Sequence, residues 1–263
     1  MSEFFGFAQE LLEKRRAQAG ETYANAELYD LGNHNAKDAE FYAQFAAKQG
    51  GRVLDLACGS GRLLPALLET NLQVAALDLS PEMIARAKMK LGANASMVDF
   101  QIADMRFFNF SQPFNTIIIP YCSLIYMYSD ADRLAVFKNC YKHLFPGGYL
   151  VFDFLAGEVE LSEGCPSLAL QGMHPFTNEI LLSVVQIKGL APDLRLLNQI
   201  NYIFPQEPNP PKITVFSSKE AVVTPARIGD LLQEVGFSVE GIYTNTTLQP
   251  YNGGEECLVV ARK

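Results

Sequence analysis

The sequence predicts an α/β fold in which a doubly wound, mostly parallel sheet of seven strands carries an antiparallel insertion of three strands. Between about residues 50 and 155, short apolar runs alternate with segments of helical spacing, which is typical of parallel strands joined by helices. Over about 160–222, apolar runs follow one another with only turn-rich pieces between them, which favours antiparallel neighbours. The 263 residues are 49% hydrophobic, enough for a proper core, and we expect a single domain over 1–263.

The elements of the parallel half follow in a regular order. Two helices are expected ahead of it, over about 3–18 and 37–48. Short apolar runs then mark the strands, at 52–57, 73–77, 97–102, 115–119 and 149–154. A helix that ends near Thr70 is expected after the first of these strands, and another runs from about Asp130 to Pro146.

The insertion and the end of the chain supply the remaining elements. Five strands are expected here, three in the insertion at 180–187, 195–204 and 213–222, and two closing strands at 237–243 and 256–261. Thr224 with Pro225 starts a helix, as Ser80 with Pro81 does in the parallel half, because Ser or Thr caps a helix N-terminus and proline fits its first position. Gly236 is expected to end the later helix.

Charge and cysteine content disfavour several classes of partner. The formal net charge of −8 disfavours nucleic acid, because an acidic chain is repelled by a phosphate backbone. The five cysteines are scattered without a C-x-x-C pair, so neither a disulfide framework nor a metal site is expected. No signal peptide and no membrane helix is indicated. We expect a cytoplasmic protein, monomeric or homodimeric, that has no nucleic-acid or membrane partner.

A glycine turn after the first buried strand indicates a nucleotide-like ligand. Gly59 and Gly61 end the segment Val53-Leu-Asp-Leu-Ala-Cys-Gly-Ser-Gly61, at a strand-to-helix turn where backbone N–H groups are free and a ligand can come close. A dinucleotide fingerprint requires a third glycine three residues later, and that position is Leu64. The turn therefore disfavours a dinucleotide and favours S-adenosylmethionine (SAM), which has no phosphate.

Three acids lie at the ends of three neighbouring predicted strands. Asp55 suits the ammonium and sulfonium charges of SAM, and Asp78 lies where a ribose-binding carboxylate belongs in this kind of sheet. Asp104 can accept from the adenine amino group, with Met83 and Met105 as apolar walls. Each acid alone is a weak signal. Together they are a strong one, because the carboxyl ends of parallel strands open into one crevice.

These ordered segments resemble the motifs of class I SAM-dependent methyltransferases, which have a Rossmann-like fold. The resemblance covers about 50–155 and rests on four segments, Asp55–Gly61, Leu77–Met83, Ala103–Met105 and Phe145–Gly148. Ala57 stands where the family usually has a first glycine. The resemblance implies a methyltransferase that uses SAM.

A narrower resemblance is to small-molecule methyltransferases that act on glycine or on nucleotide-linked amino sugars. It rests on the antiparallel insertion and on three segments, Tyr29-Asp30, Lys37-Asp38 and Tyr121–Tyr126. It implies that residues 1–48 form a helical lid and that the insertion at about 160–222 closes over the site. A dimer interface is the alternative role for the insertion.

The resemblance also implies which residues bind the cofactor and take part in transfer. Cofactor contacts are expected from Tyr29, Asp55, Ala57, Cys58, Gly59, Gly61, Asp78, Leu79, Met83, Asp104, Met105 and Pro120. Tyr126 and Tyr29 are the candidate catalytic residues, the first for positioning the acceptor and the second as a cation–π partner of the sulfonium. Ordinary aromatic packing is the alternative for both. His143 is expected late in a surface helix, where it complements the helix C-terminus.

We therefore expect methyl transfer from SAM to a nitrogen or oxygen of a small soluble molecule. One alternative is a SAM-binding protein without catalysis, because catalysis by positioning leaves no obligatory catalytic residue to look for. The other is a nicotinamide-dependent oxidoreductase, which Leu64 and the lack of a Tyr-x-x-x-Lys pair near the crevice disfavour.

Overall fold

The computed structural model describes residues 4–20, 30, 38–174, 177–206 and 209–263 of the chain. The chain divides into two compact units. The smaller one comprises Met1–Gly32 with Val159–Glu220, and the larger one comprises Asn33–Glu158 with Ala221–Lys263. No helix in these described ranges is long and apolar enough to cross a membrane.

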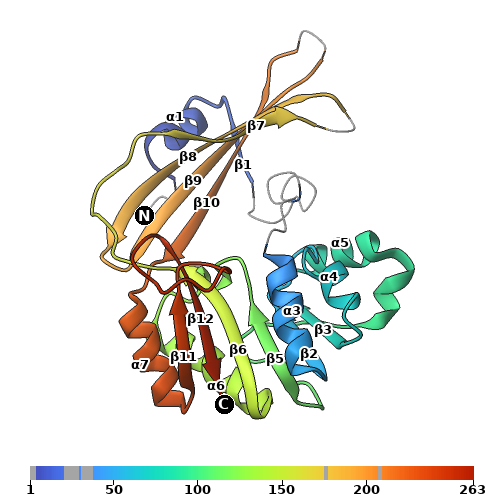
Figure 1. Ribbon diagram of the computed structural model, residues 1–263. Helices are drawn as coiled ribbons and strands as arrows, with labels where there is room; N and C mark the ends of the chain where they lie inside the picture. Colours follow the sequence, from blue (N-terminus) through green and yellow to red (C-terminus); the bar gives the residue numbers. More distant parts are fainter. Residues whose placement is uncertain (1–3, 21–29, 31–37, 175–176, 207–208) are drawn as a thin grey trace. The chain divides into compact units, whose positions relative to one another are not determined.

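Seven strands form the sheet of the larger unit (Figure 1). They are β2 (Arg52–Leu56), β3 (Gln73–Asp78), β4 (Val98–Ile102), β5 (Phe114–Ile119), β6 (Leu144–Leu155), β11 (Ser238–Tyr243) and β12 (Glu256–Arg262). Their order across the sheet is β11-β12-β6-β5-β2-β3-β4. The five strands β2 to β6 pair in parallel, and β12 runs antiparallel to both β6 and β11. The predicted seven-stranded, mostly parallel sheet is confirmed.

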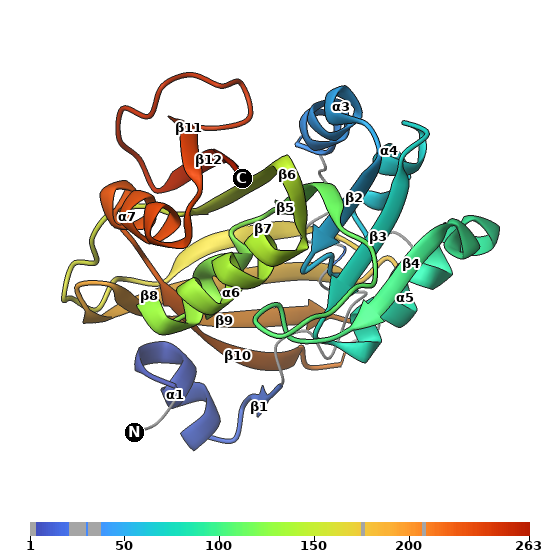
Figure 2. The ribbon, with the colours of Figure 1, turned by 90° about the horizontal axis from the view of Figure 1, so that it is seen from below.

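Helices cover both faces of this sheet. They are α3 (Ala39–Gln49), α4 (Leu64–Leu68), α5 (Pro81–Leu91), α6 (Asp130–His143) and α7 (Pro225–Val235), together with the 3-10 helices η1 (Gly92–Met97) and η2 (Ser123–Tyr126). Successive side chains of a strand point to opposite faces, so Ile117 and Ile118 enter different cores. Ile117 shares a core with Phe137 of α6 and Leu231 of α7, whereas Ile118 shares one with Tyr42 of α3. Figure 2 shows α3 and α6 on opposite sides of β5 and β6.

The helix caps lie where the sequence predicts them. The Ser80 hydroxyl accepts from the Met83 N–H at 3.2 Å, and the Thr224 hydroxyl accepts from the Arg227 N–H at 3.3 Å. The helix after the glycine turn is shorter than predicted, because it begins only at Leu64 and ends at Leu68 rather than near Thr70. The chain from Gly59 to Leu63 forms turns and bends instead.

In its described residues, the smaller unit has a sheet of five strands with a helix packed on it. It contains α1 (Gly6–Glu13), β1 (Gln18–Ala19), β7 (Ser167–Met173), β8 (Ile180–Ala191), β9 (Leu194–Phe204) and β10 (Lys212–Ala221), and the strand order is β1-β10-β9-β8-β7. Strand β8 is antiparallel to β7 and β9, whereas β1 is parallel to β10. Ala8 and Leu11 of α1 form a small core with Ile200 and Val215 of the sheet.

Two strands of this smaller sheet were not predicted from the sequence. The three predicted strands correspond to β8, β9 and β10, and the sheet gains β7 and the two-residue β1 at its edges. Strand β7 is exposed at almost every position, so it lacks the alternation of buried and exposed residues that marks a strand in a sequence. The N-terminal residues up to Gly32 belong to this unit and α3 to the larger one. The lid role of residues 1–48 stays a prediction.

Candidate functional site

The turn between β2 and α4 is a tight loop with three residues of positive φ. Ala57, Gly59 and Gly61 have φ values of +65°, +53° and +78°, a region that favours glycine. A Cβ on Gly61 would lie 2.9 Å from the Cβ of Ala87 in α5 and 3.0 Å from Leu64 Cδ1. The loop is therefore pressed against α5, and Leu64 fills the space where a dinucleotide fingerprint has its third glycine.

Asp55 is a buried carboxylate near the end of β2. Its side chain is 1% exposed, and within the described part of the chain neither of its oxygens has a hydrogen-bond partner. Burial raises the pKa of Asp55 to about 7, although the Arg62 guanidinium opposes this rise. A buried carboxylate without donors is costly, so the site fits a ligand that brings a cation or N–H donors.

Asp78 ends the neighbouring strand β3 and holds the glycine loop in place. Its carboxylate accepts from the Gly59 N–H at 2.8 Å and from the Ser80 N–H at 2.9 Å. Burial raises its pKa, while these backbone donors oppose the rise. Leu79, the next residue, is 68% exposed and offers apolar surface beside the carboxylate.

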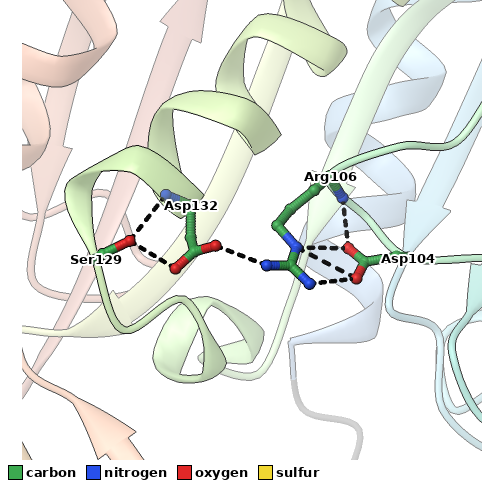
Figure 3. Close-up of polar contacts among 4 residues, drawn as sticks. All are labelled: Asp104, Arg106, Ser129 and Asp132. Carbon is green, nitrogen blue, oxygen red and sulfur yellow. Dashed lines mark hydrogen bonds and ion pairs between the residues drawn. The ribbon is translucent and has the colours of Figure 1, made fainter.

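Asp104 follows β4 and is engaged by an arginine that the sequence prediction did not single out (Figure 3). The carboxylate accepts from Arg106 Nη2 at 2.7 Å, from Arg106 Nε at 3.0 and 3.2 Å, and from the Arg106 backbone N–H at 2.8 Å. Arg106 Nη1 also donates to Asp132 of α6 at 2.6 Å. Hydrogen bonds from Arg106 hold the pKa of Asp104 below its usual value.

The loop after β5 is held by a carboxylate from β6 that the sequence prediction also missed. Tyr121 and Cys122 are consecutive residues with φ values of +59° and +53°. The Cys122 N–H donates to the Asp153 carboxylate, and the Tyr42 hydroxyl of α3 donates to the same carboxylate at 3.0 Å. Burial raises the pKa of Asp153 to about 6. Asp153 therefore fixes the start of the loop that carries Tyr126.

Arg62 links the glycine loop to two other segments. Its guanidinium forms an ion pair with Asp38, the residue before α3, with Nη2 donating to Oδ2 at 2.9 Å. The same guanidinium lies 5.1 Å from the centre of the Tyr121 ring, within cation–π distance. Arg62 thus connects the start of α3, the glycine loop and the loop after β5.

The other predicted site residues differ in how much surface they offer a ligand. Met83 is buried in the first turn of α5, Cys58 is buried in the loop, and Pro120 is buried at the end of β5. Burial raises the pKa of the Cys58 thiol, which suits a small loop residue better than a nucleophile. Met105 and Tyr126 are half-buried against the core under α6 and α7. Tyr29 lies outside the described residues.

His143 corrects one expectation from the sequence. It is 4% exposed, so it is not a surface residue. Its Nδ1 lies 2.9 Å from the Asn139 carbonyl oxygen, and its Nε2 accepts from the Phe110 N–H at 3.3 Å. Both contacts suit a neutral ring, and burial lowers its pKa. The last turn of α6 packs against Phe108 and Phe110, which the helical pattern alone did not reveal.

Three neighbouring strand ends thus present Asp55, Asp78 and Asp104, as the sequence predicts. Residues 53–148 match the family model described as a methyltransferase domain. The chain carries a methyltransferase domain. The methyltransferase domain predicted from the sequence motifs is confirmed. The Asp55 carboxylate, which has no donor among the described residues, and the tight glycine loop fit the predicted cofactor, SAM.

Among curated proteins, the methyltransferase domain is similar to YqeM of Bacillus subtilis (strain 168), which is named as a methyltransferase. The two are 36% identical over 104 residues, which are 39% of this chain and 42% of YqeM. The chain therefore matches less than half the length of that relative.

Solved structures show the same fold over nearly the whole chain. A SAM-dependent methyltransferase from Clostridium acetobutylicum ATCC 824 is 18% identical with a TM-score of 0.73, covering 90% of this chain and 96% of the other. The sugar N-methyltransferase KedS8 from Streptoalloteichus is 19% identical with a TM-score of 0.72, and the match covers 100% of this chain and 98% of KedS8. The class I methyltransferase fold predicted from the motifs is confirmed.

Proposed function

We propose that the protein transfers the methyl group of SAM to a nitrogen or oxygen atom of a small soluble molecule. The observation that carries this proposal is the buried Asp55 carboxylate, whose two oxygens have no donor among the described residues. It lies on β2, between the strand that ends in Ile119 and the strand that ends in Asp78. A ligand that brings an ammonium and a sulfonium would satisfy it.

The proposed cofactor contacts follow the three strand ends. Asp55 faces the methionine end, Asp78 accepts from the ribose hydroxyls, and Asp104 accepts from the adenine amino group. The remaining proposed contacts are Tyr29, Ala57, Cys58, Gly59, Gly61, Leu79, Met83, Met105 and Pro120. Leu79 is 68% exposed, and its apolar side chain suits one face of the adenine.

Catalysis in this proposal is mainly a matter of position. When bound, SAM supplies a methyl group activated by its sulfonium, so the bond from the acceptor atom forms as the carbon–sulfur bond breaks. The protein has to hold the acceptor atom in line at about 3 Å and exclude water. We assign acceptor positioning to Tyr126 on the loop that Asp153 holds, and cation–π stabilisation of the sulfonium to Tyr29.

Binding of S-adenosylhomocysteine (SAH) and SAM by isothermal titration tests the cofactor site. The wild-type protein should bind both, and Asp55→Asn should weaken SAH by about tenfold or more, because the ammonium loses its buried counter-charge. Asp99→Asn is the matched control, since it removes an ion pair with Arg52 at the opposite end of the same strands. No binding at millimolar SAM, together with binding of NADH, would contradict the proposal.

A catalytic assay separates methyl transfer from the alternative of a SAM-binding protein without catalysis. SAM labelled in its methyl group is incubated with the protein and a cell-metabolite extract. A labelled product of low molecular mass supports methyl transfer, and its chemical class identifies the acceptor. Tight SAH binding with no labelled product in any extract would favour the alternative.

The expected setting of the protein stays a prediction. It comprises a cytoplasmic location, a monomer or homodimer, the absence of nucleic-acid and membrane partners, and closure of residues 1–48 and of the insertion over the site. The similarity of the fold to that of a sugar N-methyltransferase supports a small-molecule acceptor.

A further inference from the structure

The Asp104 carboxylate has a nearly complete set of donors before any cofactor is bound. Its Oδ1 accepts from the Arg106 backbone N–H and from Nε, and its Oδ2 accepts from Nη2 and, more weakly at 3.2 Å, from Nε. A carboxylate offers about four lone-pair positions. The bonds from Arg106 fill about three of them, and the position left open is on Oδ2.

Arg106 is itself fixed from the other side. Its Nη1 donates to Asp132, whose other oxygen accepts from the Ser129 hydroxyl at 2.6 Å (Figure 3). That hydroxyl also accepts from the Asp132 N–H and caps α6. The guanidinium is therefore held between the β4 end and the first turn of α6, and it cannot rotate without breaking one of the two ion pairs.

We infer that Arg106 is a positioning residue that sets the purine specificity of the cofactor site. By occupying three lone-pair positions of Asp104, it leaves a single acceptor that points in a fixed direction. That acceptor suits one N–H of an exocyclic amino group and does not suit a purine that lacks this group. The inference rests on the proposed function, because it takes Asp104 as the partner of the adenine.

The side chains are accessible enough for this role. The Asp104, Arg106 and Asp132 side chains are 24%, 33% and 29% exposed, so a ligand can reach the carboxylate while the ion pairs remain in place. The fork-shaped guanidinium donates to both oxygens of the Asp104 carboxylate. A lysine ammonium is a point charge that cannot hold both oxygens of a carboxylate in one plane, so Arg106→Lys should behave like a loss of the arginine.

The test compares SAH with an SAH analogue that has hydrogen in place of the 6-amino group. The readout is the ratio of the two dissociation constants by isothermal titration. For the wild-type protein the analogue should bind about tenfold more weakly, the effect expected of one hydrogen bond to a charged group. For Arg106→Met and Arg106→Lys the ratio should fall to within about threefold.

Three further variants show which claim fails if the result differs. Asp104→Asn should also abolish the preference. If it keeps the full ratio, Asp104 does not contact the purine and the proposed placement of the cofactor is wrong.

Asp132→Asn should lower the ratio partly, because Arg106 then lacks its second ion pair, whereas Asp99→Asn should leave the ratio unchanged. The inference about Arg106 is overturned if Asp104→Asn loses the preference while Arg106→Met retains it. A purely structural role would lower affinity for both ligands equally, or lower the melting temperature, without changing the ratio.

Discussion

Two residues of the glycine loop region have features that suit binding better than stability. Asp55 is a buried carboxylate without donors among the described residues, and Ala57 has the positive φ of a glycine position. Both features raise the free energy of the ligand-free protein. Strain and unsatisfied polar groups concentrate at functional sites, so these two residues support the placement of the site here.

Asp55 should make SAH binding depend on pH. Its pKa is raised to about 7 by burial, so below pH 7 it is largely protonated in the free protein. A bound ammonium favours the ionised form, so binding releases a proton below pH 7. Affinity should therefore rise by up to about tenfold per pH unit between pH 5.5 and 7 and level off above, measured by isothermal titration. Asp55→Asn should bind more weakly and lose this dependence, and a flat wild-type profile would contradict the assignment.

The same residue should affect the stability of the free protein in the opposite sense. A raised pKa means that the folded protein binds the proton more tightly than the unfolded chain, so this group's contribution falls as pH rises from about 4 to 7. Asp55→Asn removes the ionisable group and, with it, this loss of stability at higher pH. We expect the free energy of unfolding of the ligand-free variant, relative to that of the wild-type protein, to rise by about 2–3 kcal/mol between pH 5 and pH 8 and to exceed the wild-type value at pH 8, measured by urea denaturation. A variant that is less stable at pH 8 would contradict this.

Ala57→Gly should stabilise the protein. Holding an L-residue in the left-handed region costs the folded protein about 1–2 kcal/mol. Glycine avoids this strain, but it loses more conformational entropy when the chain folds. The expected net gain is about 0.5–1 kcal/mol by urea denaturation. Asn71→Gly, at φ +58° in an exposed turn, is the control and should gain less, because asparagine tolerates this region. Equal gains at both positions would show that the loop stores no particular strain.

At the scale of elements, the connection from β5 to η2 depends on a partner in another strand. Tyr121 and Cys122 both have positive φ, and Asp153 of β6 accepts from the Cys122 N–H and from Tyr42 of α3. One carboxylate thus holds α3, β6 and the loop after β5 together. The position of η2, and of Tyr126 at its end, follows from this contact.

Asp153→Asn should therefore destabilise the protein by about 1–3 kcal/mol, because an amide provides one acceptor oxygen for two donors. Tyr42→Phe removes a single donor, and we expect a smaller loss of about 1 kcal/mol. Urea denaturation measures both. If the two variants were equally stable, the backbone donor from Cys122 would contribute little, and the loop would hold its shape without Asp153.

The elements and the site differ in how far the sequence predicts them. Periodicity and caps predict β2 to β6, α5 and α7 because these signals are local. The acids at the strand ends are predicted for the same reason. The contacts that complete the site cannot be predicted in this way, because they join residues far apart in the sequence. Tyr42 and Asp153 are 111 positions apart, and Arg106 and Asp132 are 26 positions apart. Strand β7 was missed because it is exposed on nearly all sides and has no pattern to detect.

At the scale of the whole molecule, the chain has separate cores in its two units. Two large clusters lie on the two faces of the seven-stranded sheet, and a small one of four buried residues lies under α1. The proposed cofactor residues whose positions the structure describes all belong to the larger unit. Ligand binding should therefore stabilise that unit directly.

Calorimetry should show two unfolding transitions, of which SAH raises only one. At a free SAH concentration of about 100 times its dissociation constant, the larger unit should gain about 2.7 kcal/mol. The Asp55→Asn variant serves as the control, because its transition should shift much less at the same SAH concentration. A single transition that SAH shifts as a whole would show that the two units unfold together.

The packing between Gly61 and Leu64 has a consequence for how this loop can evolve. Leu64 is fully buried and lies 3.0 Å from the point where a Cβ of Gly61 would be. A mutation of Leu64 to the third glycine of a dinucleotide loop would leave a cavity, and removing a buried leucine side chain costs about 2–5 kcal/mol. The single substitution would therefore lower the stability of the protein before the binding of a dinucleotide could offset the loss. The packing of Leu64 therefore opposes a change of this loop into a dinucleotide-binding one.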